Sequence, residues 1–170
     1  MTPPLLNSYW VIPGRLLAGE HPFGEDPLDA QNRFAALRQA GIDFFIDLTV
    51  QGERPVYQRL LHRTASYLRF PIVDCGVPDN DDQMRQIQGV IRAALAQDRN
   101  LYVHCRAGIG RTGIVIGCYL ADEGLGGKTA LTQLNRLWQQ SERSKTWPRV
   151  PQTDAQAEYI SRWSEMRKAG

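Results

Sequence analysis

The sequence predicts an α/β fold with a central, mostly parallel sheet of about four to five strands flanked by helices. Two observations support this prediction. Segments with strand-like and helix-like patterns alternate along the chain. A glycine-rich loop around Cys105 also stands between a short strand and a helix, which is where open α/β sheets bind ligands. The chain has 170 residues, 42% of them apolar and 22% charged, so we expect a single domain over residues 1–170.

In the first half of the chain, turn-forming residues separate the predicted elements. Pro13-Gly14 stands between two short apolar runs, 9–12 and 16–18, and this arrangement predicts a hairpin. A helix is predicted over residues 28–40, with Phe34 and Leu37 on one face and Gly41 at its end. The other predicted elements are a buried strand at 44–48, a short helix at 55–65 and a strand at 68–70.

In the second half, helical spacing dominates. Met84, Ile87, Ile91 and Leu95 recur at intervals that predict a helix. The run 101–103 is aromatic and β-branched, which favours a strand, and it leads directly into the glycine-rich loop. Three further helices are predicted, one from residue 111 onward, one that contains residues 131–138 and one that contains residues 160–163.

Charge and hydropathy exclude several classes of function. The net charge is +2 and the basic residues form no run, so we expect no nucleic-acid partner. No apolar stretch is long enough to span a membrane, and the N-terminus lacks the pattern of a secretory signal. We therefore expect a monomer in the cytoplasm.

The three cysteines do not form a disulfide framework or a metal-binding pattern. An odd number of cysteines without a secretion signal argues against structural disulfides. Their spacing fits no zinc motif, so we expect no metal. Cys118 falls on an apolar helix face and is predicted to be a core residue. Cys75 neighbours Asp74, and a protective disulfide between Cys75 and Cys105 stays open as an alternative.

The residues from Cys105 to Arg111, here called the cysteine loop, have the composition of an anion site. Gly108 and Gly110, with Gly113 just beyond, allow the backbone to turn tightly and to approach a ligand closely. Successive backbone N–H groups and the positive end of the following helix favour a tetrahedral dianion. Arg111 adds planar, bidentate hydrogen bonding to phosphate oxygens.

The same positive field favours the thiolate form of Cys105, and a thiolate facing a phosphate ester can attack phosphorus in line. Thr112 could donate its hydroxyl to the thiolate when sulfur leaves in a second step. Expulsion of the alkoxide or phenoxide needs a proton donor. Asp74 is the best candidate, because it begins a loop with Gly and Pro that directly follows a strand, as a mobile closing loop would.

The run His104-Cys105-Arg106-Ala107-Gly108-Ile109-Gly110-Arg111-Thr112-Gly113 resembles the signature of the cysteine-dependent protein tyrosine phosphatase superfamily. The segment 71–79, which contains Asp74, is similar to the general-acid loop of small dual-specificity phosphatases, especially the cyclin-dependent-kinase-associated type. The segment 152–156 resembles the glutamine loop of this family. The resemblance spans residues 43–163 and implies the cysteine-phosphatase fold and a phosphomonoesterase activity.

The resemblance also implies a role for each residue. Cys105 is the nucleophile, Arg111 the phosphate clamp, and Asp74 the general acid and then the general base. Gln152 and Gln156 place the hydrolytic water, and His104 orders the loop and supports the thiolate by hydrogen bonding. The backbone that holds the phosphate belongs to Arg106, Ala107, Gly108, Ile109, Gly110 and Arg111. No metal or organic cofactor is implied.

Several of these residues have simpler interpretations. Asp74 could form a turn, whereas Asp79, Asp81 and Asp82 are better interpreted as caps of the following helix. Gln152 and Gln156 could be polar residues in the first turn of a helix. Glu53 or Arg54 could contact the cysteine loop, but a surface ion pair is the favoured interpretation.

The substrate is less well defined by the sequence. We expect a phosphoprotein or another phosphomonoester, with phosphotyrosine, phosphoserine and phosphothreonine as candidates. Arg106 could favour acidic substrates. Phosphoinositide phosphatases that resemble this loop often carry a second basic residue where this chain has Ile109, which weakens but does not remove a lipid-phosphate or inositol-phosphate substrate. A phosphate-binding module without activity is a further alternative, although such a protein would be expected to lack Cys105, Arg111 or Asp74.

Overall fold

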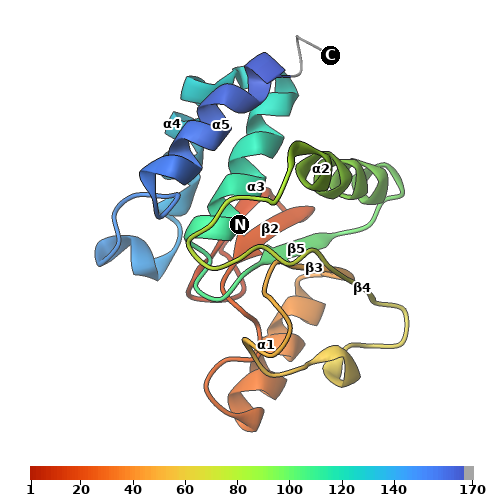
Figure 1. Cartoon of the computed structure of the whole chain (residues 1–170). Helices are drawn as coiled ribbons and strands as arrows, with labels where there is room; N and C mark the ends of the chain where they lie inside the picture. The colour runs from red at the N-terminus through yellow and green to blue at the C-terminus, as the bar shows by residue number, and fades with distance from the viewer. Residues whose placement is uncertain (167–170) are drawn as a thin grey trace.

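The computed structural model describes residues 1–166 and contains one five-stranded sheet with helices on both faces (Figure 1). The strand order is β1-β2-β5-β3-β4. The pair β1–β2 is antiparallel, and the other neighbours run parallel, which confirms the predicted mostly parallel sheet. The strands are β1 (Ser8–Ile12), β2 (Leu16–Gly19), β3 (Phe44–Asp47), β4 (Ser66–Arg69) and β5 (Leu101–His104).

Five helices surround the sheet: α1 (Pro27–Gln39), α2 (Asp81–Ala96), α3 (Gly110–Leu120), α4 (Gly127–Trp138) and α5 (Asp154–Met166). Shorter turns of 3₁₀ helix occupy Gln58–Leu60 and Glu142–Lys145, and a π-type turn occupies Ala121–Leu125. In Figure 1, α1 lies on one side of the sheet and α2 to α5 lie on the other. Among the described helices, none has both the length and the apolar character required to cross a membrane.

Side chains from the two faces of the central strand β5 pack into two separate hydrophobic cores. Leu101 and Val103 point into the larger core beneath α2 to α5, whereas Tyr102 points into the smaller core beneath α1. This alternation follows from the two-residue period of a strand. Because both faces are covered, β5 is fully buried and its carboxyl end is held from both sides.

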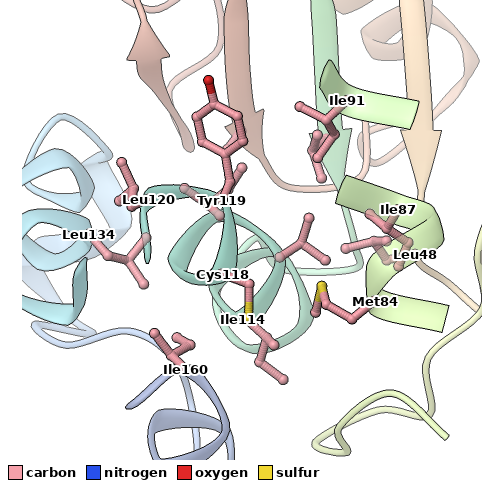
Figure 2. Packing of buried hydrophobic residues seen from close by; sticks show 14 of the residues in the cluster. Leu48, Met84, Ile87, Ile91, Ile114, Cys118, Tyr119, Leu120, Leu134 and Ile160 are labelled. Carbon is pink, nitrogen blue, oxygen red and sulfur yellow. The ribbon is translucent and has the colours of Figure 1, made fainter. Parts of the chain in front are cut away.

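Helix α3 passes through the middle of the larger core, and every one of its residues is buried. Figure 2 shows Ile114 and Cys118 of α3 among side chains from α2, α4 and α5, including Met84, Leu134 and Ile160. Cys118 is therefore the core residue that the sequence predicted, and burial raises the pKa of its thiol. This burial fixes the position of α3, and with it the loop that leads into the helix.

Two predictions about local structure are wrong. Residues 55–65 form a single 3₁₀ turn rather than a helix, because Tyr57 is anchored in the smaller core while most of its neighbours face solvent. The cap of α2 is Asn80, whose side chain accepts a hydrogen bond from Gln83 N at 2.9 Å. Asp81 and Asp82 lie in the first turn, where their charge suits the helix dipole, and Asp79 precedes the cap.

Candidate active site

The cysteine loop connects the carboxyl end of β5 to the amino end of α3, as the sequence predicted. Cys105 follows the last residue of β5 and is buried, and α3 begins at Gly110 without a side-chain cap. Among the described residues, none accepts a hydrogen bond from the backbone N–H groups of residues 106–110. Unpaired amides beside an uncapped helix end form a site for an anion.

The segment that follows β2 packs tightly against the cysteine loop. Gly108 has a φ of +76°, and a Cβ atom there would lie 2.5 Å from the carbonyl carbon of Gly19. The His21 N–H donates to the Arg106 carbonyl at 3.1 Å. Glycine is therefore required at position 108 both for the left-handed conformation and for this close approach. The Arg106 side chain is exposed beside the loop, whereas Ile109 points into the larger core.

Arg111 is buried, with 1% of its side chain exposed, and most N–H donors of its guanidinium group make hydrogen bonds or ion pairs within the protein. Glu53 binds it through two hydrogen bonds, from Nη1 to Oε2 at 2.7 Å and from Nη2 to Oε1 at 2.6 Å. The Ile72 carbonyl accepts a further hydrogen bond from Nη1 at 3.1 Å. The Nε atom is buried and has no acceptor among the described residues. Arg111 is thus held rigidly with one donor left available.

The prediction that Glu53 forms a surface ion pair is wrong. Its side chain is 14% exposed, and its partner is the arginine of the cysteine loop rather than a surface group. Hydrogen bonds from Arg111 lower the pKa of Glu53, so its carboxylate stays charged. Glu53 follows β3, which is a neighbour of β5 and runs parallel to it, so the loops after both strands meet at one edge of the sheet.

Asp74 also reaches Arg111, as expected for a residue at the site. It lies between β4 and α2 in residues 70–80, here called the acid loop. Its Oδ1 atom is 2.9 Å from Nη2 of Arg111, and half of its side chain is exposed. Cys75, the next residue, is exposed and has a φ of +59°. The acid loop therefore bends sharply beside Asp74 and presents the carboxylate to the cysteine loop.

The two glutamines lie beside both loops but make different contacts. Gln156, in the first turn of α5, is buried; its Oε1 accepts from the backbone N–H groups of Gln152 and Thr153, and its Nε2 donates to the Gly76 carbonyl. Gln152 is exposed and donates from Nε2 to Cys75 Sγ at 3.3 Å. A Cβ atom on Gly110 would lie 2.9 Å from the Gln156 amide. Gln156 thus ties α5 to the acid loop, whereas the Gln152 side chain lies at the surface.

His104 and Thr112 contact the main chain around the cysteine loop. The His104 ring lies 2.6 Å from Tyr57 OH through Nε2 and 3.4 Å from the Cys105 carbonyl oxygen through Nδ1. Burial lowers the pKa of His104, which keeps the ring neutral. The Thr112 hydroxyl donates to the Gly19 carbonyl at 3.4 Å. These hydrogen bonds hold the two ends of the loop. The contact between Tyr57 and His104 joins distant parts of the chain and has no local signal in the sequence.

All three cysteines are free thiols. In the part of the chain that the structure describes, no three His, Cys, Asp or Glu side chains are grouped as metal ligands. What the site offers is a buried thiol, a run of free amides, a clamped guanidinium group and a nearby carboxylate. This set can bind a tetrahedral oxyanion next to a nucleophile.

Comparison with known proteins assigns the chain to a class of enzyme. The family model PTP-SAK, described as "Swiss Army Knife protein, DSP-PTPase phosphatase domain", matches residues 6–159. The chain therefore belongs to this family of DSP-PTPase phosphatase domains. A curated relative, "Putative tyrosine phosphatase 197R" of Invertebrate iridescent virus 6, is 26% identical over 142 residues. The match covers 81% of this chain and 48% of the viral protein, so the chain spans about half the length of that relative.

Solved structures confirm the fold. The active form of Tk-PTP has a TM-score of 0.76 at 22% identity, and the match covers 94% of this chain and 97% of that one. The kinase associated phosphatase (KAP), with its catalytic-site cysteine replaced by serine, has a TM-score of 0.77 at 19% identity. That match covers 100% of this chain and 99% of KAP. The predicted small dual-specificity phosphatase fold is therefore confirmed.

Proposed function

We propose that this protein hydrolyses phosphomonoesters of proteins in two steps, through a phosphoryl group carried on Cys105. The observation that supports this most directly is the cysteine loop, which combines a buried thiol, five backbone N–H groups without acceptors among the described residues and the clamped Arg111. A phosphoryl dianion satisfies these donors together.

In the first step, the Cys105 thiolate attacks phosphorus, the S–P bond forms and the P–O bond to the leaving group breaks. Asp74 gives its proton to the departing oxygen, which leaves as an alcohol or phenol. The phosphoryl oxygens take Nε of Arg111 and replace the Asp74 carboxylate at Nη2, so the observed Asp74–Arg111 contact is released when the ester binds. Glu53 keeps the guanidinium group in place during this exchange.

In the second step, water attacks phosphorus, Asp74 takes a proton from the water, and the Cys105 thiolate leaves from inorganic phosphate. Gln156 uses both ends of its amide in contacts with the main chain, whereas the Gln152 side chain is exposed beside the acid loop. We therefore assign the placement of water mainly to Gln152. His104 and Thr112 hold the loop in shape, and the Thr112 hydroxyl, which donates to the Gly19 carbonyl in this structure, turns to the Cys105 sulfur when the thiolate leaves.

Phosphoproteins are the substrates that the site supports best. Arg106 is an exposed cation next to the nucleophile and suits the acidic surroundings of many phosphorylation sites. The alternative is an inositol phosphate or phosphoinositide, which carries several phosphate groups and calls for additional cations around the loop. The side chain of Ile109 is apolar and packed in the core, so the loop offers no cation at that position.

A panel of substrates tests this assignment. We expect hydrolysis of phosphotyrosine and phosphothreonine peptides of the same sequence, with kcat/KM for both above that for inositol phosphates. The measurement is phosphate release under identical conditions. A preference for inositol phosphates would replace the phosphoprotein assignment. Binding of all these ligands without turnover would indicate a phosphate-binding module instead of an enzyme.

Asp74→Asn tests the general acid separately. We expect kcat to fall by about 10²-fold, because the leaving oxygen then departs without a proton. The measurement is kcat of the wild type and of the variant under identical conditions. Asp79→Asn is the matched control, because Asp79 lies in the same loop outside the contact with Arg111. An unchanged kcat in Asp74→Asn together with a lowered kcat in Asp79→Asn would move the acid to Asp79.

A further inference from the structure

Arg143, far along the chain from the cysteine loop, donates a hydrogen bond to that loop. It lies in the 3₁₀ turn Glu142–Lys145, and its Nη1 atom is 2.6 Å from the Ala107 carbonyl oxygen. Its Nη2 atom pairs with Glu20 at 2.8 Å. We propose that Arg143 is a positioning residue, which orients the Ala107–Gly108 peptide group so that the Gly108 N–H faces the phosphoryl group. This inference rests on the proposed function of the cysteine loop.

The geometry of a peptide group links the Arg143 contact to the direction of the Gly108 N–H. The peptide between Ala107 and Gly108 is trans and planar, so its C=O and N–H bonds point in opposite directions. Arg143 holds the Ala107 carbonyl away from the loop, and the Gly108 N–H must then point the other way. The His21 N–H acts on the Arg106 carbonyl in the same manner and turns the Ala107 N–H. Two successive amides are thereby aimed in a common direction, which is what an anion nest requires.

Gly108 has more conformational freedom than any other residue type would have at this position. Its φ of +76° is one that glycine reaches as easily as a negative value, so the preceding peptide can rotate at little cost. A stiffer residue cannot replace it, because a Cβ atom would lie within 2.9 Å of the Gly19 and Glu20 backbone. The loop therefore depends on an outside contact to select one orientation. A charged donor such as Arg143 makes a stronger hydrogen bond than a neutral one.

Arg143 is itself held in place by Glu20. Glu20 is nearly buried, and its Oε2 atom accepts from both Arg143 and Asn7. Its Oε1 atom pairs with Arg33 of α1 at 2.5 Å. Arg143 is thus fixed between a carboxylate and the Ala107 carbonyl. Arg33 shares the same carboxylate, but its other hydrogen bonds reach the His21 and Pro22 carbonyls and not the cysteine loop.

This difference between the two arginines separates positioning from simple structural support. If Arg143 only ties its 3₁₀ turn to the body of the protein, Arg143→Met and Arg33→Met should have similar consequences, because each removes one ion pair with Glu20. If Arg143 positions the Gly108 amide, the Arg143 variant alone should lose affinity for an oxyanion. Methionine keeps most of the apolar stem in both variants.

The experiment measures tungstate binding by calorimetry in a Cys105→Ser background, and turnover of p-nitrophenyl phosphate with Cys105 present. We expect Arg143→Met to weaken tungstate binding and to lower kcat/KM by about tenfold or more each, since a preorganised backbone donor is lost. Arg143→Lys, which keeps one charged donor, should recover part of both. Arg33→Met should stay within about twofold of the parent in both. Thermal unfolding of each variant identifies any loss of the fold.

Equal losses of tungstate affinity in the two methionine variants, or unchanged affinity in Arg143→Met, would overturn the positioning role while leaving the proposed function intact. If Arg143→Met does not fold, Arg143→Gln decides, because its shorter and uncharged side chain also loses the contact with Ala107, and unchanged tungstate affinity in that folded variant would overturn the positioning role. A parent protein that neither binds tungstate nor turns over substrate would instead contradict the proposed function, and the inference would fall with it.

Discussion

Cys105→Ser is expected to lower the turnover of p-nitrophenyl phosphate by at least about 10⁴-fold, because a serine hydroxyl is not ionised at neutral pH and cannot replace the thiolate as nucleophile. Binding of a phosphate analogue should persist. The groups proposed to hold the anion are the backbone N–H groups of residues 106–110 and the guanidinium group of Arg111, and none of them changes. Loss of turnover with retained binding is therefore the expected combination.

The measurement pairs steady-state kinetics with calorimetric binding of tungstate. Cys118→Ala is the matched control, since it removes a cysteine that is buried in the core around α3 and makes no part of the proposed site. It should cost stability through a small cavity and leave kcat nearly unchanged. Turnover close to the wild-type rate in Cys105→Ser would exclude a cysteinyl-phosphate intermediate.

The parts of the fold that the sequence predicted are those encoded locally. The hairpin contains Pro13-Gly14, α1 ends at Gln39 shortly before Gly41, and α2 displays its apolar residues at helical intervals. Residues 55–65 show the limit of this approach. Tyr57 is held by burial and by its hydrogen bond to His104, which are contacts with distant parts of the chain. Local propensity therefore does not determine the conformation of that segment.

The candidate site shows the same division. The spacing of Cys105 and Arg111 is local, so the loop and its position between β5 and α3 were predictable. The pairing of Arg111 with Glu53 was not predictable, because it depends on the order of the strands in the sheet. Since β3 lies between β4 and β5 in the sheet, the loop after β3 brings Glu53 next to the loops that follow both neighbours. A single sequence does not reveal that order. The contact of Arg143 with Ala107 was equally unpredictable, because it joins residues 36 positions apart in the chain.

Arg111→Lys is expected to lower kcat/KM for p-nitrophenyl phosphate by about 10³-fold, with the fold retained. The positive charge remains, so a purely electrostatic role would predict a small effect. The structure instead gives each donor of the guanidinium group its own direction. Nη1 and Nη2 both point to Glu53, Nη1 also to the Ile72 carbonyl and Nη2 also to Asp74, whereas Nε has no described acceptor. A lysine ammonium group drawn to Glu53 has no second, rigidly directed donor for the phosphoryl oxygens.

Arg69→Lys provides the comparison that separates geometry from charge. Arg69 also binds a buried carboxylate through two donors, with Nε and Nη2 at 3.3 Å and 3.0 Å from Oδ2 of Asp47. Its replacement should destabilise the protein to a similar degree, because each variant weakens one ion pair with a largely buried carboxylate, while kcat/KM should change little. A small kinetic effect of Arg111→Lys would mean that charge alone is sufficient at this position. In that case the rigid pairing with Glu53 would serve stability and not the orientation of the phosphoryl group.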